Sequence, residues 1–322
     1  MDVVSLCPLP VAAVLWNTEK RGWSLTVVAK ATSVLAPAVM PLAPEQLPIH
    51  RADVHYDDDP QQSVYAAGDL APFKPRVDVL LVGHAHARGG MPTTSMVARL
   101  RLGSIDKALR IQGARVRDES GDVGPAAELR KLPLRYERSL GGPGSLNPVG
   151  VPAVGEPDAD GANSLPNIEP TGDEMRAVPV GFGPIAATWP SRRDRLGRHA
   201  DGWSHDRWYE RALPEIDLSY FNAAPDDQQL EMLTSDVLLE LVNVHPDHPR
   251  LRTHLPRLWP QAYIERSSAP PELLTLRCDT VWIDTDAGIC TMTWRGQLRL
   301  ENPKEAGRCL VVVSKAGKTM AW

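Results

Sequence analysis

Two histidines in Gly83-His84-Ala85-His86 are the residues best spaced for metal chemistry in this chain. Side chains two positions apart on a β-strand point to the same side, so both imidazoles could bind one ion. His199, His205 and the acidic run at residues 57–59 could supply further ligands. A metal site needs three or four convergent ligands, and the sequence places only two. A strand end that leads into the Arg88-Gly89-Gly90 turn is therefore the simpler interpretation.

No other catalytic or ligand-binding pattern is complete in the sequence. The acidic run at 57–59 lacks the alternating oxygen ligands, central glycine and distal Glu of a calcium loop. Ser139 precedes a glycine pair, but it has neither a strand-to-helix elbow nor a placed histidine. A Glu137 and Asp226 pair carries no weight as a glycosidase site, because the chain holds 40 acidic residues. Phosphate-binding glycine motifs are also missing. We therefore expect a protein that is not an enzyme and has no cofactor.

Composition and charge exclude further classes of function. The formal net charge is −5, with both signs interspersed, whereas a nucleic-acid binder needs a basic stripe that neutralises phosphates. The N-terminus lacks the basic region of a signal peptide, and the longest apolar run, at 77–82, is too short to span a membrane. These features predict a soluble cytoplasmic protein that binds neither nucleic acid nor membrane.

The four cysteines, Cys7, Cys278, Cys290 and Cys309, have no CxxC spacing and sit among apolar neighbours. They are typical of small core residues in a reducing compartment. Alternation in the sequence would allow Cys278 and Cys290 to face each other across a hairpin. A disulfide bond there would indicate an oxidising compartment instead.

Alternating apolar and polar residues predict β-strands in the informative parts of the chain. Strands are expected at 23–34, 78–83 and 310–313, and hairpins at 96–111, 237–255 and 274–294, where turn residues separate two alternating segments. In 96–102 one strand face is apolar and the other is largely cationic, through Arg99 and Arg101. The predicted fold class is mainly β, with antiparallel sheets (sandwich or open-barrel-like), long Pro/Gly-rich loops and few short helices.

Residues 141–184 are rich in Gly, Pro, Asn and Asp and show almost no periodicity. Such a long loop inside a compact domain is usually functional or disordered. We therefore expect an N-terminal β unit at 1–140, a Pro/Gly-rich loop region at 141–184 and a C-terminal β unit at 185–322, packed together as one domain. Helices of two or three turns could form at 201–211 and 226–233.

Three loop segments gather aromatic, Arg, Asn and Pro residues, at 132–138, 181–190 and 220–229. Aromatic and Arg side chains form the hot spots of protein interfaces. The same residue types also hold long loops in place, by burying rings and satisfying backbone groups. The residues that we expect either to bind a partner or to anchor these loops are Arg135, Tyr136, Glu137, Arg138, Phe182, Trp189, Phe221, Asn222, Asp227 and Gln228.

These segments belong to a series of blocks that resembles the domain-of-unknown-function family 2169. The blocks follow in order from about residue 23 to 296, which is far more specific than any single motif. The sequence departs at His86, where an aromatic residue is expected, and this departure weakens a two-histidine metal site. The blocks that carry the resemblance are Ala71-Pro72-Phe73-Lys74-Pro75, Asp78-Val79-Leu80-Leu81-Val82-Gly83-His84, Pro133-Leu134-Arg135-Tyr136-Glu137-Arg138, Asn147-Pro148-Val149-Gly150, Leu165-Pro166-Asn167, Gly181-Phe182-Gly183-Pro184-Ile185, Phe221-Asn222-Ala223-Ala224-Pro225, Asp227-Gln228-Gln229, Leu276-Arg277-Cys278-Asp279-Thr280-Val281-Trp282-Ile283-Asp284 and Trp294-Arg295-Gly296.

The resemblance implies a protein of bacterial type VI secretion that is not an enzyme. Members of this family resemble adaptors, or effector chaperones, that bind an effector with a PAAR-like domain and help to load it onto the VgrG spike. The implied partners are therefore the PAAR-like effector and the VgrG spike protein, and the resemblance supplies no catalytic residues. Two alternatives stay open: a metal-dependent hydrolase that uses His84 and His86, and a structural component secreted together with the spike.

Overall fold

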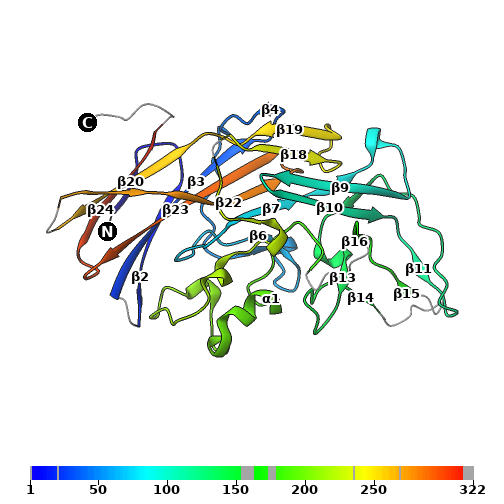
Figure 1. Ribbon diagram of the computed structural model, residues 1–322, viewed down its shortest axis with the longest axis horizontal. Coiled ribbons are helices and arrows are strands. Elements are labelled where there is room, and N and C mark those ends of the chain that lie inside the picture. The colour runs from blue at the N-terminus through cyan, green and yellow to red at the C-terminus, as the bar shows by residue number, and fades with distance from the viewer. Residues whose placement is uncertain are drawn as a thin grey trace.

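The computed structural model describes residues 2–19, 22–153, 163–172, 179–234, 236–267 and 270–314. The protein is mainly β, as the sequence predicts, and its sheets are open (Figure 1). Its short helices are α1 (Pro190–Arg193) and 3-10 turns at Tyr56–Asp58, Arg88–Gly90, Tyr136–Arg138, Asp194–His199, His205–Arg207, Leu218–Phe221 and Asp226–Gln228. No helix in the described part of the chain is long and apolar enough to cross a membrane.

A six-stranded sheet, called the central sheet below, forms the middle layer. Its parallel neighbours β7 and β22 lie side by side, and its other pairs are antiparallel. Both faces of this sheet are covered, so β3 and β23 are buried along most of their length. In spatial order the strands are β17 (Gln229–Leu230), β7 (Val77–Val82), β22 (Arg277–Asp284), β23 (Ile289–Leu300), β3 (Gly22–Val34) and β2 (Val11–Thr18).

Two further sheets pack on one face of the central sheet. The second sheet has the order β16 (Ile168–Pro170), β10 (Ile105–Gln112), β9 (Ser95–Leu102), β18 (Leu238–Val242), β19 (Arg250–His254) and β4 (Ala38–Val39). The third sheet has the order β1 (Asp2–Ser5), β24 (Ala306–Ser314), β20 (Trp259–Arg266) and β21 (Glu272–Thr275). In Figure 1 the second sheet lies at the upper right and the third at the left.

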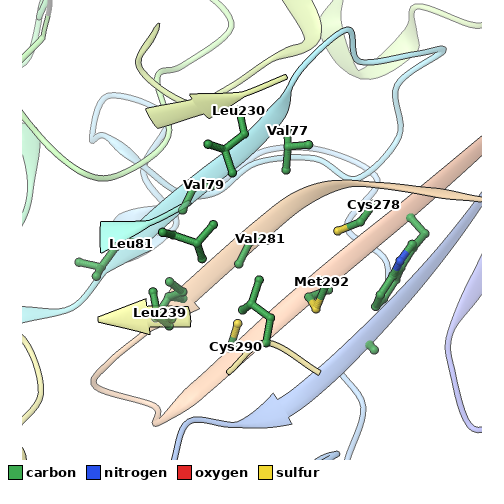
Figure 2. Close-up of a cluster of buried hydrophobic side chains, with 14 of the residues drawn as sticks. Val77, Val79, Leu81, Leu230, Leu239, Cys278, Val281, Cys290 and Met292 are labelled. Carbon is green, nitrogen blue, oxygen red and sulfur yellow. The ribbon is translucent and has the colours of Figure 1, made fainter. Parts of the chain in front are cut away.

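The main core lies between the central sheet and these two sheets. It is built by alternate side chains of each strand, because successive residues of a strand point to opposite faces. Figure 2 shows part of it, where Val79 of β7, Val281 of β22 and Met292 of β23 gather with Leu239 of β18. One continuous apolar cluster therefore joins strands from both halves of the sequence.

The opposite face of the central sheet carries a smaller apolar cluster and many polar side chains. Rings of Trp208, Tyr220 and Phe221, from the segment that follows α1, pack there with Trp16 of β2. The remaining short strands pair outside the three sheets. They are β5 (Val54–His55) with β6 (Val64–Ala66), β8 (His84–His86) with β12 (Lys131–Pro133), β11 (Val116–Arg117) with β15 (Asn163–Ser164), and β13 (Leu140–Gly141) with β14 (Val151–Pro152).

The strands predicted at 23–34, 78–83 and 310–313 are confirmed as β3, β7 and part of β24. The hairpins at 96–111 and 237–255 are confirmed as β9–β10 and β18–β19. In the third hairpin, β22–β23, the start differs from the prediction. Leu274 belongs to β21 of the third sheet, and the chain then continues into β22 of the central sheet. Both large sheets combine strands from before residue 140 and after residue 185, while residues 154–162 and 173–178 of the 141–184 region lie outside the described residues.

The helices expected at two stretches do not form, and the cysteine pairing that the alternation would allow is not present. The stretches 201–211 and 226–233 form single 3-10 turns, not helices of several turns. Gly202 interrupts the first at φ +75°, and in the second Gln229 and Leu230 pair with β7. Cys278 and Cys290 do not face each other, because Cys278 lies opposite Trp294 and Cys290 opposite Ile283. Both thiols are free.

Candidate functional site

The first two loop clusters meet around the ring of Tyr136, which is buried. Its hydroxyl donates to the carbonyl oxygen of Gly183 (2.9 Å), and its ring meets Trp189 edge-on, with ring centroids 5.1 Å apart. A Cβ at Gly181 would lie 2.4 Å from the Tyr136 ring, so only glycine allows this approach. Phe182, between the two glycines, is fully buried in the main core. The loops at 132–138 and 181–190 are therefore packed together through these side chains.

The third cluster is attached to the central sheet through Asp78 of β7. Asn222 donates from Nδ2 to Asp78 Oδ1 (2.8 Å) and to the carbonyl oxygen of Arg76 (2.9 Å). The backbone amides of Ala223 and Ala224 also donate to the Asp78 carboxylate, at 2.9 and 3.2 Å. Next to Asn222, the buried Phe221 ring packs against Trp208 and Tyr220.

Asp227 and Gln228 connect this cluster to the second sheet. Lys107 of β10 donates to Asp227 Oδ1 (2.9 Å) and to Gln228 Oε1 (2.7 Å). The Gln228 amide donates in turn to the carbonyl oxygens of Val79 (2.7 Å) and Phe182 (2.8 Å). Gln228 is fully buried and makes three of these four contacts, so its side chain connects Lys107 of the second sheet with β7 and with the loop at Phe182.

Three of the ten candidate residues lie nearer the surface, in the 3-10 turn that holds Tyr136 and in its N-cap. Arg135 stacks over the ring of Tyr56, 3.9 Å from its centroid, and pairs with Asp57 (3.1 Å). The Glu137 carboxylate accepts from the backbone and the hydroxyl of Ser63, at 2.6 and 2.8 Å. Arg138 is exposed. The other side chains of the set are buried or, for Asp227, half-buried, so a partner could touch most of them only if the loops opened.

The sequence reasoning missed a layer of buried ion pairs on the same face of the central sheet. Lys74 pairs with Asp78 (2.8 Å), Lys30 with Asp69 (2.8 Å), and Arg295 with Asp279 (2.7 Å). Burial opposes the charged form of Asp69, but the attraction and hydrogen bond of Lys30 and the backbone amide of His50 together outweigh it, so the pKa of that carboxyl is lowered. The sequence signal for this layer is the alternation of apolar residues with Thr, Lys, Asp or Arg along the strands. Alternation by itself does not indicate whether such a polar face is covered by other segments.

A cavity of about 10 Å³ lies within this layer, beside Lys30 and His50. It is about the size of one water molecule. His50 Nδ1 is buried and has no hydrogen-bond partner among the residues that the structure describes, and burial lowers the pKa of this imidazole. The arrangement suits a water bound between polar groups and leaves no room for a substrate.

His84 and His86 follow β7, next to the end of its parallel neighbour β22. His84 Nδ1 lies 2.6 Å from Asp286 Oδ2, and the two histidine rings have centroids 6.3 Å apart. The hydrogen bond from His84 lowers the pKa of Asp286, and burial lowers that of His86. Within the described ranges, no three His, Cys, Asp or Glu side chains are grouped so that they could hold a metal ion.

The further ligands that the sequence suggested for these histidines lie elsewhere. His205 is half-buried beside Asp53, with Nε2 3.7 Å from Oδ1, and its ring contacts Tyr220 and Phe221. Burial lowers its pKa to about 4. His199 Nε2 accepts a hydrogen bond from Nε of its neighbour Arg198 (3.3 Å). What the structure does assemble around His84 is a hydrogen-bonded His–Asp pair, which fixes the orientation of the imidazole.

Comparisons with known proteins give one match. A family model described as an uncharacterized protein conserved in bacteria (DUF2169) matches residues 20–295. No curated protein and no solved structure matches the chain. The matched range includes the three loop clusters and the layer of buried ion pairs.

Proposed function

Since the chain belongs to the DUF2169 family of uncharacterized bacterial proteins, we propose that it is an adaptor, or effector chaperone, of a type VI secretion system. It binds an effector that carries a PAAR-like domain and promotes loading of this effector onto the VgrG spike. The adaptor acts in the cytoplasm, before secretion, and catalyses no reaction.

The observation that carries this proposal is the ordered series of sequence blocks between residues 23 and 296. The structure adds that several of these blocks contact one another. Lys74, Asp78, Asn222 and Gln228 lie in different blocks, yet they contact one another or the same strand, β7. Such blocks maintain a scaffold of loops on a sheet, and a rigid scaffold with ordered surface loops suits a binding protein.

Shielding of the effector is the physical mechanism that we propose. A PAAR-like tip is rich in β-structure and has strand edges and apolar surface that would aggregate before assembly. The third sheet offers a matching surface, because its outward face carries an apolar row in register across four strands. The row consists of Leu273, Tyr263, Leu310 and Val4, and Leu273 is 50% exposed. Edge pairing and apolar contact are both established ways for a sheet to hold another β element.

Co-expression with the PAAR-like effector encoded beside its gene tests the proposal. We expect the two proteins to co-purify, and we expect secretion of the effector to stop when the adaptor gene is deleted. No complex, together with unchanged secretion, would refute the proposal. Recovery of this protein in the culture supernatant with the effector would instead identify it as a structural component that leaves with the spike.

A further inference from the structure

The outward face of the second sheet carries five arginines on three of its strands, β10, β9 and β19, with β18 between β9 and β19. Strand register places Arg101 of β9 next to Glu240 of β18, and Glu240 next to Arg252 of β19. In the adjacent row, Arg99 of β9 faces Val242, which faces Arg250. Arg110 of β10 lies opposite Val97, one row further along. These side chains point away from the main core, since the alternate residues Leu100, Leu239 and Leu251 are the buried ones.

Among the residues that the structure describes on this face, two carboxylates pair with four of the five arginines. Asp106 binds Arg99 through both oxygens, at 2.6 Å each, and lies 3.3 Å from Arg101. Glu240 binds Arg250 (3.0 Å) and Arg252 (3.2 Å). Hydrogen bonds from Arg99 and Arg250 lower the pKa of Asp106 and of Glu240, respectively, so both carboxylates are charged at neutral pH. Five arginines against two carboxylates leave three positive charges in excess.

Arg110 differs from the other four arginines in its ion pairing. It forms no ion pair with any residue that the structure describes, because Glu169 opposite it is bound by Arg115 (2.6 Å) and by Gln112 (2.6 Å). The arginines of β19 are also open to solvent, with side chains 62% exposed at Arg250 and 57% at Arg252. Val97, which is 43% exposed, adds an apolar contact among the guanidinium groups.

We propose that this arginine face binds an acidic surface of a partner protein. Guanidinium groups form planar, bidentate hydrogen bonds with carboxylates, and Arg is enriched at the centres of protein interfaces. The excess charge is notable because the whole chain carries a net charge of −5. The face is therefore a local region of opposite sign, which orients an acidic partner during encounter.

Two other occupants fit this face less well. A nucleic acid would bring its phosphates against Asp106 and Glu240, and the negative charge of the whole chain would repel it. A second copy that used the same face would set arginines against arginines, because a two-fold interface pairs each patch with itself. An acidic protein surface meets neither difficulty.

The experiment compares two variants with the same change in net charge. Arg110→Glu with Arg250→Glu reverses two charges on the arginine face, and Glu240 keeps its contact with Arg252. Arg198→Glu with Arg211→Glu is the matched control, since both residues are exposed in the segment that covers the opposite side of the central sheet. Circular dichroism and thermal melting verify that both variants are folded.

Binding of a fluorescein-labelled peptide of alternating Glu and Ser residues is measured by anisotropy, with a DNA duplex as the second probe. We expect the arginine-face variant to bind the peptide at least about tenfold more weakly than the wild type, the control to change by less than about twofold, and salt to weaken binding. Equal loss in both variants, or no loss in either, would overturn the proposal. Tighter binding of DNA than of peptide would assign the face to nucleic acid. A change of oligomeric state in the arginine-face variant alone would assign it to a second copy.

A second measurement tests whether the arginine face binds the effector, and this step rests on the proposed function. The peptide experiment does not rest on it. The same variants are co-expressed with the PAAR-like effector, and we expect the control to capture it and the arginine-face variant to lose it. Capture by all forms would place the effector elsewhere and overturn the arginine face as its site. If even the wild type captures no effector, the proposed function fails, while the peptide result still decides whether the arginine face binds acidic surfaces.

Discussion

Removing the charge of Asp78 is expected to damage the fold more than any exposed substitution. This carboxylate is fully buried in β7 and accepts four hydrogen bonds, from Lys74, Asn222 and the amides of Ala223 and Ala224. Asp78→Asn keeps the size of the side chain but replaces one acceptor oxygen by a donor. The Lys74 cation then loses its counter-ion while it stays buried.

The magnitude follows from the two kinds of group that lose a partner. Breaking a buried ion pair by removing one partner costs about 3–5 kcal/mol. A buried donor without an acceptor costs about 1–3 kcal/mol. We therefore expect Asp78→Asn to lower the free energy of unfolding by roughly 4 kcal/mol, a large part of the 5–15 kcal/mol typical of a folded protein. Lys74→Met should cost less, because Asp78 keeps three N–H donors.

A double-mutant cycle isolates the coupling between the two charges. The double variant Lys74→Met with Asp78→Asn should lose roughly 2 kcal/mol less than the sum of the single variants, because neither charge is left alone in the interior. Glu210→Gln, which removes an exposed pair with Arg207, is the control and should leave stability almost unchanged, because solvent screens that pair.

Urea unfolding, followed by tryptophan fluorescence and by circular dichroism, measures these differences. The chain has nine tryptophans, and several of them lie close to the ion-pair layer. An Asp78→Asn variant within about 1 kcal/mol of the wild type would refute the reasoning. Strict additivity of the two single changes would refute the proposed coupling, even if each variant were destabilised.

Three further predictions concern other parts of the fold. Tyr136→Phe removes the hydrogen bond to Gly183 and should cost about 1 kcal/mol in urea unfolding, and an unchanged midpoint would contradict that estimate. His245 Nδ1 accepts from two backbone amides of its own turn, and burial lowers its pKa from 6.5. Because its pKa is lower in the folded state, His245 binds protons more readily in the unfolded state, and its contribution to stability, present above about pH 6.5, is lost as the pH falls. The melting temperature should therefore drop less between pH 7.5 and 5.5 in His245→Asn than in the wild type. Zinc or a chelator should leave the melting temperature unchanged, whereas one bound metal per chain, lost in a variant with both His84→Gln and His86→Gln, would favour the hydrolase alternative.

Much of the architecture could be predicted from the sequence, because strand patterns are local. Ala98, Leu100 and Leu102 alternate with polar neighbours over a few residues, and turn residues follow at once, so β9 and β10 were predicted as a hairpin. The aromatic and Asn residues of the loops could also be predicted from their types, since long ordered loops need such side chains as anchors. Their partners could not be named in advance.

What the sequence by itself determined is therefore which segments alternate, which of them turn back on a neighbour, and which loops carry large anchoring side chains. Only the tertiary structure decided that β7 lies parallel to β22, that Asp78 is bound by Asn222, and that His84 meets Asp286. It also decided that the polar face of the central sheet is buried while the cationic face of the second sheet is exposed. Both faces alternate in the same way along their strands, and the difference arises because distant segments cover one face and leave the other open.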